Sequence, residues 1–168
     1  MMAVMESHAR PRPDHVDLCI IGSGSGLSLI DDDIDDWQIA LLDNGVGPTQ
    51  IFGGTCLNAG CIPSKRLAKP AGFSLAPEQA RLINADVKFL GVDHKAAQAR
   101  VFGRTDEVAE AGLAGLASRE NVQVLIGRAT FVDQHTISVG GRQLTADRIV
   151  IAAGSRPRMP EVPGFDDP

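Results

Sequence analysis

The feature that most constrains the fold is a glycine-rich turn between two short apolar segments near the start of the chain. Val16–Ile21 is rich in β-branched residues and predicts a buried strand, and the run Gly22-Ser23-Gly24-Ser25-Gly26 follows at once. Leu27 opens a predicted helix that continues into Asp31–Asp36, and acidic side chains near its C-terminus are expected to keep it short. Gln38–Leu42 predicts a second buried strand. This order is typical of an α/β unit that binds a dinucleotide.

The glycine turn has the residues that a bound pyrophosphate requires. Gly22 permits a tight turn, Gly24 lets a phosphate approach the backbone, and a helix N-terminus would favour the negative charge. Asp43 ends the second strand, where a carboxylate accepts hydrogen bonds from a ribose diol. The third glycine of the usual fingerprint is due at position 27, which holds Leu27, so either the helix packs less closely or Gly26 takes that role. The predicted dinucleotide contacts are Gly22, Ser23, Gly24, Ser25, Gly26, Asp43 and Asn44.

The middle of the chain predicts helices. Pro70, Gly72 and Pro77 are expected to break a helix or to begin one, because proline lacks the backbone N–H donor. Gln79–Leu90 predicts a further helix. Lys95–Leu116 predicts a longer packing helix, whose apolar face is expected to contain Val101, Val108, Ala109 and Leu116.

From Val122 onward the apolar period changes to two, which predicts strands. Gly140-Gly141 is a hairpin signal between two of them. The fold class is therefore α/β: a Rossmann-like parallel sheet with helices, plus a small antiparallel β-meander. The predicted strands are Val122–Ile126, Ala129–Val132, Thr136–Val139, Arg142–Thr145 and Arg148–Ala153.

Two cysteines lie five residues apart in the segment Phe52–Lys65, which also contains Gly53, Gly54 and Gly60. On an ideal helix, five residues rise about 7.5 Å and turn about 500°, which separates the Cα atoms by roughly 8–9 Å. A disulfide tolerates only ~7 Å, so a bond between Cys56 and Cys61 requires a distorted backbone, which Gly60 permits. A disulfide across so short a loop is expected to be strained and therefore labile.

A helix that begins near Cys56, together with the charge of Lys65, is expected to lower the pKa of a thiol here. Two alternatives remain open: a pair of unpaired thiols, and a zinc site. Zinc needs four ligands, and Cys19 and the histidines show no ligand spacing, so no metal site is predicted. Cys19 lies in an apolar strand and is expected to be buried and inert.

Composition excludes several classes of partner. The net charge of −5, the absence of Tyr and the single Trp argue against nucleic-acid binding. No apolar run approaches the ~20 residues of a membrane span, and the N-terminus lacks a signal-peptide core, so the expected location is the cytoplasm. Residues 1–14 are interpreted as a disordered arm, and the Pro-rich residues 158–168 as a linker.

The unbroken run from Gly53 to Lys65 resembles the redox-active site of the flavin-dependent pyridine nucleotide–disulfide oxidoreductases. In that family electrons pass from NAD(P)H through FAD to the disulfide and then to a disulfide substrate. The resemblance makes residues 15–157 an FAD-binding domain, with residues 52–65 as its redox segment. It implies that Cys56 attacks substrate and that Cys61 contacts the flavin.

The resemblance also extends the set of cofactor contacts. Ile151–Pro157 resembles the second FAD signature of the family, and Gly127-Arg128-Ala129 resembles a segment that contacts adenine. Less specific sequence features outside the cysteine segment resemble the mycothione reductases most. The dihydrolipoamide dehydrogenases are the alternative enzyme. The added cofactor contacts are Gly54, Thr55, Lys65, Ala129, Ala153, Gly154 and Ser155.

The resemblance covers nearly the whole chain, but the chain covers only about a third of the family's usual length. An NAD(P)-binding domain and a dimerisation domain would lie beyond it. We therefore expect an N-terminal portion of a homodimeric enzyme that acts on a low-molecular-weight disulfide, and we expect the isolated chain to be inactive. Two competing interpretations are a non-catalytic FAD-binding module and an unrelated NAD-binding domain with incidental cysteines.

Overall fold

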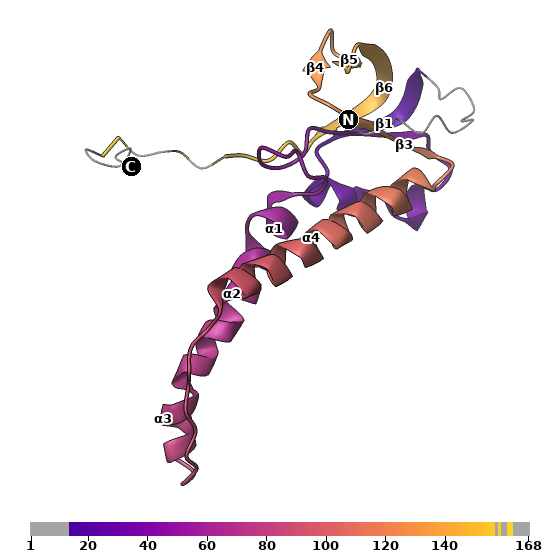
Figure 1. Ribbon diagram of the computed structural model, residues 1–168. Coiled ribbons are helices and arrows are strands. Elements are labelled where there is room, and N and C mark those ends of the chain that lie inside the picture. Colours follow the sequence, from indigo (N-terminus) through magenta and orange to yellow (C-terminus); the bar gives the residue numbers. More distant parts are fainter. Residues whose placement is uncertain (1–13, 157, 159–160, 163–168) are drawn as a thin grey trace.

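The computed structural model describes residues 14–156, 158 and 161–162 and contains a six-stranded sheet, from which a helical arm extends (Figure 1). The strand order is β3-β2-β1-β6-β5-β4. The first four strands in this order run parallel, and β6, β5 and β4 form an antiparallel meander. The predicted α/β class with a parallel sheet and a small meander is therefore confirmed. The strands are β1 (His15–Ile21), β2 (Ile39–Asp43), β3 (Val122–Ile126), β4 (Thr130–Phe131), β5 (Thr136–Val139) and β6 (Arg142–Ile151).

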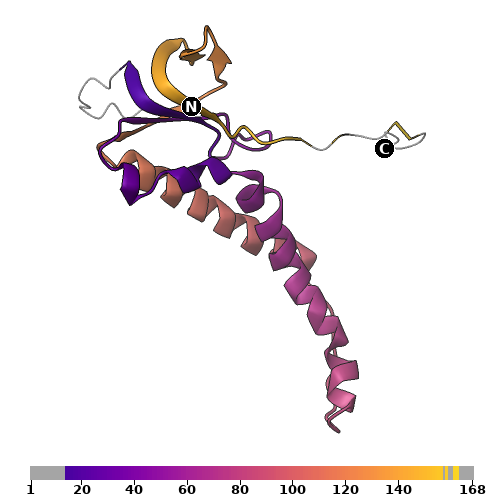
Figure 2. The ribbon, with the colours of Figure 1, turned by 180° about the vertical axis from the view of Figure 1, so that it is seen from behind.

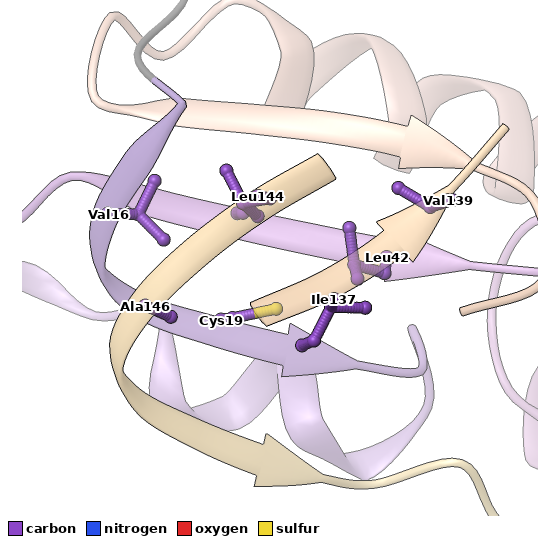
Figure 3. Close-up of a cluster of buried hydrophobic side chains, with 8 residues drawn as sticks. Val16, Cys19, Leu42, Ile137, Val139, Leu144 and Ala146 are labelled. Atoms are coloured by element: carbon purple, nitrogen blue, oxygen red, sulfur yellow. The ribbon is translucent and has the colours of Figure 1, made fainter. Parts of the chain in front are cut away.

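Strand β6 corrects one prediction, because the two strands expected at Arg142–Thr145 and Arg148–Ala153 are one continuous strand. Residues 142–145 pair antiparallel with β5, and residues 145–151 pair parallel with β1. The strand curves strongly and thereby joins the meander to the parallel sheet (Figure 3). The Gly140-Gly141 turn before it is confirmed, with φ angles of +58° and +82°.

The sheet is covered on both faces. One core lies between β1, β2 and the meander and includes Val16, Cys19, Leu42 and Ile137 (Figure 3). The second core lies on the opposite face, where Ile20, Leu41 and Phe52 contact α4 and Trp37. Alternate residues of β1 and β2 thus supply both cores, as expected for buried strands.

The helices differ more from prediction than the strands do. In place of a helix from Leu27 to Asp36, two short 3-10 helices occupy Ser25–Leu29 and Asp32–Ile34. The helix expected at Gln79–Leu90 ends at Arg81, because Asn84 takes a φ of +57° and reverses the chain. The remaining helices are α1 (Thr55–Asn58), α2 (Cys61–Gly72), a 3-10 helix at Phe73–Leu75, α3 (Ala76–Arg81) and α4 (His94–Ala117).

Helices α2 and α3 and the segment that returns to α4 form an arm that projects from the sheet (Figures 1 and 2). Pro77 begins α3, as predicted, but Pro70 lies inside α2 near its end and does not break it. The missing N–H of Pro70 leaves the Arg66 carbonyl without a helical donor only two residues before α2 ends at Gly72.

Helix α4 confirms the predicted packing helix and extends from the arm to the sheet. The Asp93 side chain caps it by accepting a hydrogen bond from Ala96 N at 2.9 Å. Val101 and Ala109 are buried as predicted, whereas Val108 is 40% exposed. No helix in the described part of the chain combines the length and apolar character of a membrane crossing. The predicted arm at 1–14 and most of the predicted linker at 158–168 lie outside the described residues.

Candidate functional site

The glycine turn after β1 is shaped by contacts that exclude side chains. Gly22 has a φ of +109°, and a Cβ there would lie 2.3 Å from the Ala152 carbonyl oxygen. A Cβ on Gly26 would lie 2.8 Å from Ala152 Cβ and 2.8 Å from Ile20 Cγ2. Gly26 therefore takes the close-packing role that the fingerprint assigns to position 27, which was one of the two predicted solutions.

The prediction that an α-helix begins at this turn is wrong. The element is a five-residue 3-10 helix with Gly24 at its cap, so it has at most a small dipole. An anion at this turn would be held by the backbone N–H groups of the turn itself.

Asp43 is a buried carboxylate at the carboxyl end of β2, and it is only 7% exposed. Asp43 Oδ1 accepts a hydrogen bond from Ser23 N at 3.3 Å. Asp43 Oδ2 is buried and has no hydrogen-bond partner among the described residues. Because a buried acceptor without a donor is unfavourable, this oxygen is suited to the hydroxyl groups of a ligand.

The cysteine segment packs directly on the glycine turn. A Cβ on Gly54 would lie 2.6 Å from Gly24 Cα, so the two backbones are in contact and position 54 has no room for a side chain. Gly53 N donates to Ser23 Oγ at 2.8 Å. Two segments that are thirty residues apart in the sequence are thereby fixed side by side.

The backbone between the cysteines is interrupted, as predicted. Cys56 lies in α1, Cys61 begins α2, and Gly60 between the helices has φ −122° and ψ −105°. Both thiols are free and exposed in this structure. The geometry thus brings together two accessible sulfurs that a single helix would hold apart.

The predicted lowering of a thiol pKa is wrong for Cys56. Its hydrogen bond with the Cys61 side chain raises the pKa of Cys56, and desolvation adds to this effect. The charge of Lys65 acts in the expected direction, but it is the weakest of the contributions. The Cys56 thiol therefore loses its proton less readily than an ordinary cysteine thiol.

The turn, Asp43 and the cysteine segment surround one cavity of about 1020 Å³. Most of the predicted contacts line it: Gly22, Ser23, Gly24, Ser25, Asp43, Gly54, Thr55, Cys56, Ala153, Gly154 and Ser155. This volume is at the upper end of the ~300–1,000 Å³ of ordinary ligand pockets, so a large ligand fits.

Five predicted residues do not line the cavity. Gly26 is buried beneath the turn, and Ala129 packs against the core that contains Cys19. Asn44, Cys61 and Lys65 are exposed. Of the two cysteines, Cys56 therefore lines the cavity, and Cys61 lies outside its lining.

Sequence reasoning missed the part of the wall that α4 supplies. Val108, Ala109 and Gly112 of this helix line the cavity, as do Phe52 and Arg156. Ala109 and Gly112 are small residues three apart on one helix face, and a Cβ on Gly112 would meet nothing within 4 Å, so this face of α4 leaves open space at the cavity.

Comparisons with known proteins agree with this geometry. The family model described as pyridine nucleotide-disulphide oxidoreductase matches residues 16–168. The mycothione reductase of Mycobacterium tuberculosis is 34% identical over 150 residues, which is 86% of this chain and 32% of that protein. The glutathione reductase of Nostoc sp. is 31% identical over 152 residues, which is 89% of this chain and 32% of that protein.

A solved structure shares the fold. The Cu(II) complex of the HOCl-induced flavoprotein disulfide reductase RclA from Escherichia coli matches with a TM-score of 0.70 and 26% identity. The match covers 89% of this chain and 31% of that one. The chain thus spans about a third of the length of the curated relatives it matches.

Proposed function

Because the chain belongs to the pyridine nucleotide-disulphide oxidoreductase family, we propose that it is the FAD-binding, redox-disulfide part of a flavin-dependent disulfide reductase. One observation carries the proposal: the glycine turn, the buried Asp43 carboxylate and the Cys56 thiol line the same cavity. The FAD pyrophosphate would be held by the backbone of the glycine turn, and a ribose hydroxyl would donate to Asp43 Oδ2.

In this proposal the two cysteines carry out a two-step thiol–disulfide exchange with a disulfide substrate. The Cys56 thiolate attacks one sulfur of the substrate, forms a mixed disulfide and releases the first thiolate. Cys61 then attacks the Cys56 sulfur, forms the Cys56–Cys61 disulfide and releases the second thiolate. When bound, the reduced flavin would supply the electron pair that, with two protons, returns this disulfide to two thiols, and NAD(P)H is the proposed source of those electrons.

We propose a low-molecular-weight disulfide as substrate, with mycothione as the first candidate. The motif cues and the 34% identity to a mycothione reductase support this choice. The similarity to a glutathione reductase and to a dihydrolipoyl dehydrogenase of Mycoplasma genitalium keeps those two activities as alternatives. A homodimeric, cytoplasmic enzyme is part of the same proposal.

Flavin titration tests the proposed cofactor. Asp43→Asn keeps the oxygen that accepts from Ser23 N and replaces Oδ2 by an amide NH2, which donates and cannot accept from the ribose hydroxyl; we expect it to weaken FAD binding by about 2 kcal/mol, or roughly thirtyfold. Asp36→Asn is the matched control, because Asp36 is an exposed acid that does not line the cavity. Flavin fluorescence and visible absorbance report the binding, and NAD⁺ added in parallel distinguishes an NAD-binding domain. Equal FAD affinity of wild type and Asp43→Asn would contradict the proposed site.

A further inference from the structure

Asn58 is a buried amide between the two redox cysteines. It ends α1, whose residues Thr55 and Cys56 are exposed, yet Asn58 itself is only 8% exposed. Asn58 Nδ2 donates to the Phe52 carbonyl oxygen at 2.9 Å. Its Oδ1 is buried and has no hydrogen-bond partner within the described ranges. A polar side chain kept at this cost, where an apolar one would pack, indicates a role other than stability.

Helix α1 needs such an anchor. It has only four residues, and a helix of one turn is not stable by itself in water. The break at Ala59 and Gly60 separates it from α2, so α2 does not extend it. The position of the Cys56 sulfur therefore depends on the side-chain contacts of α1.

Phe52, whose carbonyl oxygen accepts the hydrogen bond from Asn58, is held in place by its own contacts. Phe52 is 8% exposed and packs in the core on the α4 side of the sheet. The next residue, Gly53, donates to Ser23 Oγ at 2.8 Å, and Ser23 N donates to Asp43 Oδ1 at 3.3 Å. A continuous set of buried hydrogen bonds thus runs from the carboxylate in the cavity wall to the helix that carries Cys56.

We propose that Asn58 is a positioning residue for the redox pair, and that its amide fixes α1 so that the Cys56 sulfur stays against Cys61. This inference rests on the proposed function, because it assumes that the two cysteines act together. The contact that it preserves is the one with Cys61 that raises the pKa of Cys56.

The test is the pH profile of Cys56 alkylation in the full, reduced chain, followed by mass spectrometry of the Cys56 and Cys61 peptides. Asn58→Leu keeps the bulk of the side chain and removes the donor. In this variant, we expect the midpoint of the pH profile of Cys56 alkylation to fall by about half a pH unit or more, toward that of an ordinary thiol. The reason is that the contact between Cys56 and Cys61 is loosened.

The matched control is Asn121→Leu. Asn121 Nδ2 donates to the carbonyl oxygens of Asp35 and Trp37, both at 3.1 Å, so the same chemical change occurs far from the cysteines. This variant is expected to lose stability and to keep the wild-type Cys56 profile. If Asn58→Leu does not fold, Ser23→Ala removes the next hydrogen bond of the set and is expected to shift the midpoint in the same direction.

Failure of the positioning role and failure of the proposed function give different results. If a folded Asn58→Leu or Ser23→Ala chain keeps the wild-type midpoint, the positioning role is wrong. If oxidised glutathione produces no Cys56–Cys61 disulfide even in the wild-type chain, the proposed function itself fails. A disulfide in the wild-type chain together with a shifted midpoint in the variants supports both.

Discussion

The three cysteines illustrate how environment alone sets thiol chemistry. Cys56 and Cys61 are exposed and interact with each other, whereas Cys19 is fully buried in the core beneath the meander. Burial raises the pKa of Cys19 to about 12, so it has almost no thiolate at neutral pH. Reactivity should therefore be confined to the two exposed cysteines, Cys56 and Cys61.

The direction of the Cys56 shift gives a prediction for labelling. Because its pKa is raised, Cys56 releases its proton at a higher pH than an ordinary cysteine, and its alkylation by iodoacetamide should rise at correspondingly higher pH. Cys19 should remain unlabelled in the native chain and should react after denaturation. A Cys56 midpoint below that of free cysteine, measured by peptide mass spectrometry, would refute the assigned hydrogen bond.

The contact between two glycines gives a second prediction. Gly54→Ala places a Cβ 2.6 Å from Gly24 Cα, where backbone must move, and is expected to cost about 1–3 kcal/mol of unfolding free energy. Gly103→Ala in α4 is the control: its Cβ meets nothing within 4 Å, and it should gain about 0.5–1 kcal/mol. Chemical denaturation measures both, and a fully stable Gly54→Ala chain would mean that the two segments are not in contact.

At the scale of elements, strands were more predictable than helices. The strands β1 and β2 are mostly apolar runs that supply both cores, so their sequence reflects their environment directly. Helices near the site follow tertiary contacts instead: Gly26 packs under Ala152, and α1 is held by Asn58. The candidate site was largely predictable because glycines and Asp43 have local signatures, whereas the wall formed by α4 depends on packing between distant segments.

The turn between β4 and β5 makes an element-level prediction about acid stability. Asp133 Oδ1 accepts hydrogen bonds from His135 N and Thr136 N, both at 2.8 Å. The backbone hydrogen bond from His135, the largest contribution, lowers the pKa of Asp133. Its stabilising effect is therefore present above the unfolded pKa of about 4 and is lost as the pH falls through the lower folded pKa.

Asp133→Asn should consequently be less stable than wild type at neutral pH, and the difference should shrink below about pH 4. Denaturant titrations across this range measure it, with the exposed Asp32→Asn as a control for loss of one negative charge. A difference that is independent of pH would show that the carboxylate does not hold the turn.

At the scale of the whole molecule, the arm exposes an unusual amount of apolar surface. Leu82 is 83% exposed, Ile83 is 76% exposed and Leu90 is 96% exposed. Exposed apolar patches of this kind favour association. Among the described residues, the arm is therefore the part most prone to self-association.

Replacing Leu82 and Leu90 together by Glu should raise the solubility of the chain and reduce its binding of a hydrophobic dye. Lys88→Glu is the matched control, because it changes charge on the same arm without removing apolar surface. Light scattering and dye fluorescence measure the effect. Unchanged scattering in the double variant would place the association elsewhere on the molecule.

The central claim is that Cys56 and Cys61 act as one electron-accepting pair beside a flavin in the cavity. Anaerobic reductive titration of the FAD-loaded, oxidised chain tests it most directly, because a disulfide takes up an electron pair in addition to that of the flavin. The wild-type chain should consume two more electrons per flavin than Cys56→Ser. Equal consumption by the two proteins would contradict the account.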